Sequence, residues 1–87
     1  DLLIDEDTIV RSTTIRAISA RRVPGWLTIM KRSLLDSDYV IQRSAMDGLL
    51  EDKKEGVPLL IDYILKNPQS RISNLAKIEL RKIGVQP

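Results

Sequence analysis

Apolar residues recur along this chain at helical spacing in five segments, which polar or Pro- and Gly-containing stretches separate. The first segment, residues 7–20, contains a cluster of β-branched residues that alone would suit a strand. Its periodicity favours a helix, and Asp7 is a suitable N-cap for that helix. The positions at helical spacing are Val10, Thr14, Ala17, Ile18 and Arg21.

The other four segments predict four more helices. Pro24 suits the first turn of the second helix, and Asn67-Pro68 has the form of a cap and first-turn proline for the fifth. Gly84 is a suitable C-terminal stop for the fifth helix, near Ile83. The apolar faces are Trp26, Leu27, Met30 and Leu34 in the second helix, Ile41, Ala45 and Leu49 in the third, and Leu60, Ile61 and Ile64 in the fourth.

A constant offset of 31 residues, such as that from Asp5 to Asp36, relates three stretches of the chain. A fixed period of this length is typical of stacked repeats, in which one unit buries its face only against the next. We therefore predict an all-α chain whose five helices form a short right-handed α-solenoid of antiparallel pairs, with units of about 5–35, 36–66 and 67–87. The offset aligns Val10 with Ile41 and Ile72, Thr14 with Ala45 and Ala76, and Ile18 with Leu49 and Leu80.

These residues resemble HEAT-like repeats of the short class named after the phycobilisome (bilin) lyases. In that family the first helix follows an Asp-rich turn, starts with Val-Arg and ends near Leu-x-x-Ile-Gly, as in Asp7–Arg11 and Leu80–Gly84. The second helix opens with Val-Pro-x-Leu-Ile, as in Val57–Ile61, whereas Gln42 and Ser73 stand where the family favours Arg. The resemblance implies a single domain of about two and a half HEAT-like repeats over residues 1–87. No Met precedes Asp1, which fits a processed product or a fragment, and Leu2-Leu3-Ile4 resembles the end of an apolar helix, so we expect a fragment of a longer repeat protein.

The resemblance leaves the function open, because such repeats serve as scaffolds, as enzyme-associated modules, as lyases and as a few DNA glycosylases. Composition excludes several kinds of catalytic site. The chain has no Cys and no His, so it lacks a thiolate nucleophile and the commonest general base and metal ligand. Its four glycines are scattered and form no phosphate-binding loop. We therefore expect a protein that is not an enzyme and needs no cofactor or metal.

No apolar run approaches the roughly 20 residues that span a bilayer, so we expect no membrane partner. The absence of Cys suits a reducing compartment, and we expect a cytoplasmic location.

Two acidic clusters stand at predicted helix starts: Asp5-Glu6-Asp7, and Asp36 with Asp38. They could pose as carboxylate pairs or as a metal site. Acids at a helix start bind its unpaired N–H groups and oppose its dipole, and no calcium-loop spacing accompanies them. We therefore predict that both clusters cap helices.

A basic belt lies in residues 11–34, which contain no acid, while the rest of the chain holds eight bases against twelve acids. Phosphate contacts need such a belt, so binding of a nucleic acid or an acidic partner is our second candidate function. The alternative is that these cations stabilise helix C-termini, and the chain has few aromatic residues for base stacking. The belt comprises Arg11, Arg16, Arg21, Arg22, Lys31 and Arg32.

Our first candidate function is a non-enzymatic protein–protein interaction or scaffold module. The resemblance implies that the second helix of each unit lines the concave side of the stack. There Tyr63 and Ile29 lie off the apolar faces, so we expect both to be exposed beside charged residues, which is typical of a protein-binding surface. The alternative for this pair is scattered surface apolar residues. The predicted partner-binding surface is Thr28, Ile29, Arg32, Leu59, Asp62, Tyr63 and Lys66.

Trp26 aligns with Leu60 and is predicted to lie in the core. At the N-terminal end, Leu2, Leu3 and Ile4 are apolar, and we expect this end to dock against upstream sequence or against another copy of the chain. A third candidate function, implied by the resemblance, is an accessory domain of a larger enzyme such as a bilin lyase.

Overall fold

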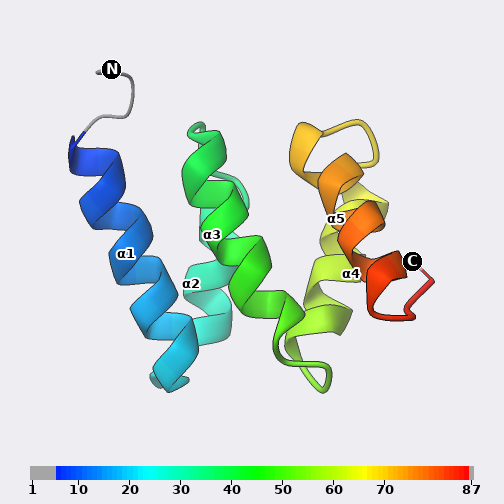
Figure 1. Ribbon diagram of the computed structural model, residues 1–87, viewed down its shortest axis with the longest axis horizontal. Helices are drawn as coiled ribbons and strands as arrows, with labels where there is room; N and C mark the ends of the chain where they lie inside the picture. Colours follow the sequence, from blue (N-terminus) through cyan, green and yellow to red (C-terminus); the bar gives the residue numbers. More distant parts are fainter. Residues whose placement is uncertain (1–5, 87) are drawn as a thin grey trace.

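The computed structural model describes residues 6–86 of the chain, and this part contains five helices and no strand (Figure 1). The all-α prediction is therefore confirmed. The expectations for Leu2–Ile4 and Asp5 lie outside the described residues. None of the described helices is long and apolar enough to cross a membrane. The helices are α1 (Glu6–Arg21), α2 (Trp26–Ser33), α3 (Tyr39–Leu50), α4 (Gly56–Lys66) and α5 (Arg71–Lys82).

The helices lie in two rows. A front row is formed by α1, α3 and α5, with α3 in the middle, and α2 and α4 form a second row behind it (Figure 1). In the second row, α2 contacts both α1 and α3, α4 contacts both α3 and α5, and α2 and α4 contact each other. As a result α3 contacts all four of the other helices, and the core is centred on it.

The apolar faces of the second, third and fourth helices lie where the spacing predicts them. Leu27 and Ile61 are half-buried at the edge of these faces, and the other eight positions are buried. The prediction that Trp26 lies in the core is confirmed, with 7% of its surface exposed. The buried apolar residues are Ile15, Trp26, Met30, Leu34, Ile41, Ala45, Met46, Leu49, Val57, Leu60, Tyr63, Ile64, Ile72, Ala76 and Leu80.

Helix α1 differs from the other front-row helices. The positions that align with the buried stripes of α3 and α5 are largely uncovered: Val10 is 58% exposed, Thr14 is exposed and Ile18 is half-buried. The face that α1 buries against α3 instead contains Ile15 and two polar residues. The 31-residue alignment of α1 with α3 and α5 therefore predicts that α1 is a helix, but it does not predict which face of α1 is covered.

Two predicted helix starts are displaced. Helix α1 begins at Glu6, so Asp7 lies inside the first turn and is not the N-cap. Helix α2 begins at Trp26, after Gly25 in the left-handed conformation (φ 82°). Pro24 therefore precedes α2 and does not lie in its first turn.

The N-cap of α5 is Ser70, not Asn67. The Ser70 hydroxyl oxygen accepts a hydrogen bond of 3.0 Å from the backbone N–H of Ser73, which satisfies one of the unpaired donors at the helix start. Asn67 instead follows the end of α4, where its side-chain amide donates to the Tyr63 carbonyl oxygen at 3.0 Å. Ser70, two residues after Pro68, therefore caps the start of α5.

Helix α5 ends at a Schellman motif, as Gly84 predicts. The Val85 N–H donates to the Leu80 carbonyl at 2.9 Å, the Gly84 N–H donates to the Arg81 carbonyl at 3.0 Å, and Gly84 has φ 83°. Helix α1 ends in the same way, with Arg22 (φ 50°) in the left-handed position. Arg22 and Gly84 are 62 residues apart, twice the repeat period.

Candidate functional site

A cavity of about 170 Å³ opens on the second row, between α2 and α4. Lys31 of α2 and Leu35, just after α2, form one side of it. Helix α4 and its C-cap form the other side, and most of the exposed lining is apolar. The residues of that second side are Leu59, Asp62, Tyr63, Lys66 and Asn67.

Tyr63 belongs to both the cavity wall and the core. Only 8% of its surface is exposed, so the prediction of an exposed Tyr63 is wrong. Its hydroxyl donates to the Ser70 hydroxyl at 3.3 Å, and that hydroxyl in turn donates to the Ser73 hydroxyl at 3.0 Å. Ser70, the N-cap of α5, thus fixes the hydroxyl end of the tyrosine.

The exposed apolar surface of the cavity comes mainly from Leu35, which is 66% exposed, beside the half-buried Leu59. Lys66 pairs with Asp62 at 3.1 Å on α4, but both side chains are more than half exposed, so the pair adds little stability. Lys31 has no hydrogen-bond or ion-pair partner in the described part of the chain. The cavity therefore combines an apolar wall with a net positive rim.

Four of the seven residues predicted to bind a partner line this cavity, and all four come from α4. The three α2 residues Thr28, Ile29 and Arg32 do not line it. Ile29 is half-buried and packs on the core, because it lies three residues after the buried Trp26 and four residues before the buried Ser33, on the same side of α2. Lys31 of α2 and Leu35, just after α2, line the cavity instead. The Leu34-Leu35 pair was the available sequence signal, since adjacent residues of a helix point roughly 100° apart and a buried Leu34 can therefore leave Leu35 at the surface.

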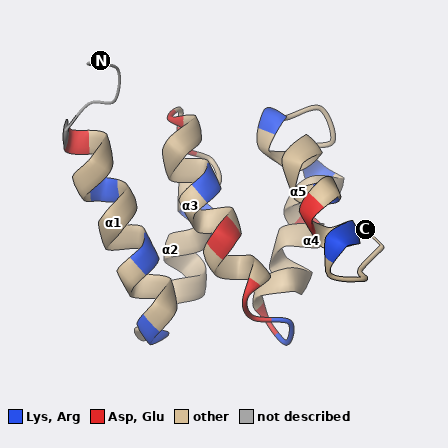
Figure 2. Cartoon of the chain, in the orientation of Figure 1, with Lys and Arg blue, Asp and Glu red and all other residues tan. Residues whose placement is uncertain are grey.

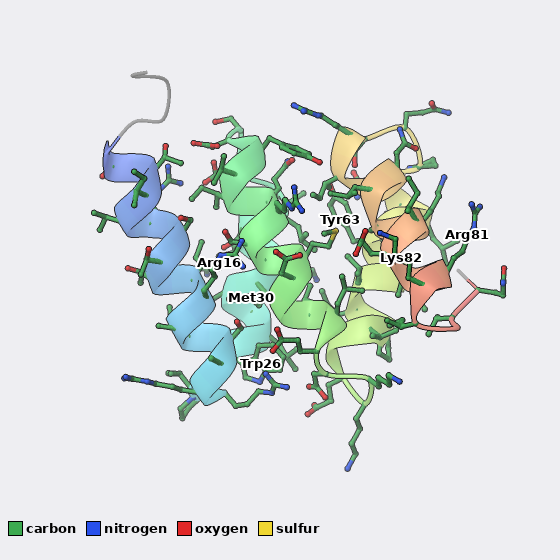
Figure 3. All side chains as sticks on the ribbon, in the orientation of Figure 1. Arg16, Trp26, Met30, Tyr63, Arg81 and Lys82 are labelled. Carbon is green, nitrogen blue, oxygen red and sulfur yellow. The ribbon has the colours of Figure 1, made fainter. Side chains whose placement is uncertain are left out.

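Half of the predicted basic belt is engaged within the chain. Arg11 pairs with Asp36, and Arg16 points from α1 toward α3 (Figure 3), where it pairs with Asp47 at 3.2 Å. Basic positions recur along α1, and α3 carries an acidic position that lies beside α1 in the view of Figure 2. Both acids follow α2 in sequence, so these pairs join α1 to the part of the chain that follows α2. Part of the basic belt therefore forms ion pairs that link α1 to α3 and to the segment just before α3.

The guanidinium of Arg22 lies over the Trp26 ring, 4.6 Å from its centroid, and donates to the Ser19 carbonyl at 2.6 Å. Arg21, Lys31 and Arg32 have no hydrogen-bond or ion-pair partner among the described residues. All three lie in or beside the last turn of α1 or α2, where a cation is favoured by the helix dipole.

The second acidic cluster caps a helix, as predicted. Asp38 is the N-cap of α3 and accepts from the Val40 N–H at 2.9 Å. It also accepts from the Thr8 hydroxyl of α1 at 2.7 Å. The Thr8 hydrogen bond, followed by that of Val40, lowers the pKa of Asp38 below its ordinary value of 3.8. Within residues 6–86, no three acids, histidines or cysteines gather into a group that could hold a metal ion.

Comparison with known proteins finds no matching family model, no matching curated protein and no matching solved structure. The likeness to HEAT-like repeats therefore rests on the residues and the repeat period of this chain.

Proposed function

We propose that this chain is a non-enzymatic protein-interaction module that receives an apolar side chain of its partner between α2 and α4. The observation that carries the proposal is the cavity there, whose volume of about 170 Å³ has room for far more than one water molecule. Ligand sites are commonly concave and mostly apolar, with a few polar groups at the edge. Leu35 and Leu59 supply the apolar surface, and the buried Tyr63 supplies a rigid wall.

The frame in this proposal is a short right-handed α-solenoid of antiparallel helix pairs, about two and a half HEAT-like repeats within a longer protein. Its support is the two-row contact pattern together with the 31-residue period. The paired Schellman ends at Arg22 and Gly84, two periods apart, add to that support. Such a frame holds its surface residues at fixed positions, which reduces the entropy lost on binding.

The partner's chemistry follows from the rim of the cavity. Lys31 and Lys66 flank the apolar wall, and only Lys66 has an acid beside it. A partner segment with a bulky apolar side chain next to a carboxylate would match both the wall and the rim. The protein would then bind an acidic, apolar peptide segment.

Two leucines of nearly equal exposure provide the test. Leu35 lines the cavity and is 66% exposed, whereas Leu65 is 70% exposed and does not line it. Peptides selected from a displayed random library on the purified chain should lose more than about tenfold in affinity with Leu35→Glu. Leu65→Glu should leave their affinity within about twofold of the original chain. Equal binding to both variants would remove the cavity as the binding site.

A second candidate function rests on Arg21, Lys31 and Arg32, the cations of the basic belt that have no described partner. Here the ligand would be a nucleic acid or another polyanion. A titration with a labelled generic nucleic acid at low and at physiological salt tests it. Phosphate binding should weaken steeply as salt rises, and the absence of binding even at low salt would eliminate this candidate.

A further inference from the structure

The three front-row helices carry one stripe in the same repeat register, but only two of the stripes are covered. In α5 the stripe is Ile72, Ala76 and Leu80, and each of these residues is 0% exposed. In α3 the aligned residues are also buried. In α1 the aligned Val10 is 58% exposed, followed by an exposed threonine and a half-buried isoleucine.

The neighbours of the two end helices explain the difference. Helix α5 contacts one second-row helix, α4, which precedes it in the chain. Helix α1 also contacts one second-row helix, α2, but α2 follows it. The stripe of α5 is buried and that of α1 is not, so the stripe is covered by the second-row helix that comes before it. Helix α3 fits this rule, because α2 precedes it and contacts it.

The uncovered face of α1 forms a wide, mostly apolar hollow. Thr13, Thr14, Ala17 and Ile18 line it along the helix, and Val23 lies beyond the helix end. Arg21 stands at the same end of the hollow and has no hydrogen-bond or ion-pair partner among the described residues. The face thus presents small apolar and hydroxyl side chains with one cation at the edge.

We propose that this face of α1 binds a further helix pair, supplied from outside residues 1–87. The second helix of that pair would pack on α1 as α4 packs on α5. That helix would be amphipathic, with apolar residues spaced as Leu60 and Ile64 are in α4, and it would present a carboxylate to Arg21. A second copy stacked end to end fits less well. The hollow at the α5 end is lined by Lys77 and Arg81, which would bring more positive charge toward Arg21.

The test adds a preceding second-row helix, with its front-row partner, to the 87-residue chain. A copy of residues 36–66, which holds the α3 and α4 sequences, is fused directly before Asp1. Residues 1–5 then form the connection, close in length to the four residues that join α4 to α5. Hydrogen exchange of the α1 amides should slow by about tenfold or more relative to the original 87-residue chain, and the melting temperature should rise.

The control is the double variant Thr14→Glu, Ala17→Glu, made in both chains. In the original chain both positions are exposed, so the melting temperature should change little. In the fused chain the two carboxylates should abolish the added protection of α1, because they would be buried beneath the new helix. A fused copy that gains no helical circular dichroism, or one that folds and leaves α1 exchange unchanged, overturns the proposal.

Discussion

The two end helices of the front row, α1 and α5, share a repeat register but are attached to the molecule in different ways. Helix α5 is fixed by a completely buried apolar stripe. Helix α1 contributes one buried apolar residue, Ile15, and its remaining buried residues, Thr8 and Ser19, are polar. A repeated sequence pattern thus determines where the helices form, while the neighbouring helices determine which interactions attach each helix to the molecule.

At α1, polar contacts replace buried apolar surface in attaching the helix to the rest of the molecule. The Thr8 hydroxyl donates to Asp38, and two arginines of α1 pair with acids at and before α3. The backbones also approach closely near Gly48, where a Cβ atom would lie 2.5 Å from the Ser19 hydroxyl oxygen. The absence of a side chain at Gly48 therefore allows α1 and α3 to pack together.

The largest predicted difference between the two ends comes from truncating aligned stripe residues. Ile72→Ala in α5 should lower the free energy of unfolding by about 3 kcal/mol, because it leaves a cavity in a fully buried site. The aligned change Val10→Ala in α1 should cost less than about 0.5 kcal/mol, since the side chain is mostly in solvent. Urea unfolding of both variants measures this. Losses of similar size would contradict the contrast between the ends.

A smaller effect is predicted at the α1–α3 contact. Gly48→Ala should lower the free energy of unfolding by about 1–2 kcal/mol. The new methyl group would meet both the Cβ and the hydroxyl of Ser19, and Ser19 Cβ cannot move without its helix. Adding Ser19→Gly in the same chain should recover part of the loss by removing both atoms. If Gly48→Ala alone raises stability through its better helix propensity, the close approach is not what positions α1.

The smallest effect concerns pH. The pKa of Asp38 is lowered in the folded chain, chiefly by the Thr8 hydroxyl, so its contribution to stability is present above the ordinary pKa of 3.8. That contribution is lost as the pH falls through the lower, folded pKa. Thr8→Val should therefore reduce the melting temperature at neutral pH, and its difference from the original chain should narrow in acid. A difference that stays constant with pH would assign the role of Thr8 to packing alone.

The sequence was sufficient to predict the five helices and most of the core, because period and spacing determine both. The covered face of α1 could not be predicted, since it depends on a neighbour and not on α1 itself. Tyr63 is a different case, because it stands three residues after Leu60 and next to Ile64, a spacing that indicates the buried face of α4. Only the hydrogen bond of its hydroxyl to Ser70 depends on the connection that follows the helix. The left-handed Arg22 has no signal in its residue type, although its alignment with Gly84 two periods later points to it.

The predicted partner-binding surface includes four α4 residues that line the cavity but neither Lys31 nor Leu35. On α4, Leu59, Asp62 and Lys66 lie where the spacing places them. On the other side, Lys31 of α2 and Leu35, just after α2, line the cavity, and Ile29 packs on the core. Helix rotation depends on packing against two neighbours at once, which the spacing in one short helix does not contain.

The two-row arrangement also has a consequence for the rate of folding. Every contact between helices joins elements that are adjacent or next-but-one in the chain, such as α1 with α3 or α2 with α4. Each loop that must close is therefore about one repeat long, and the entropy lost on closure is small. Helical proteins of such low contact order fold in about microseconds to milliseconds, and the chain can start from any adjacent pair and add its neighbours in turn.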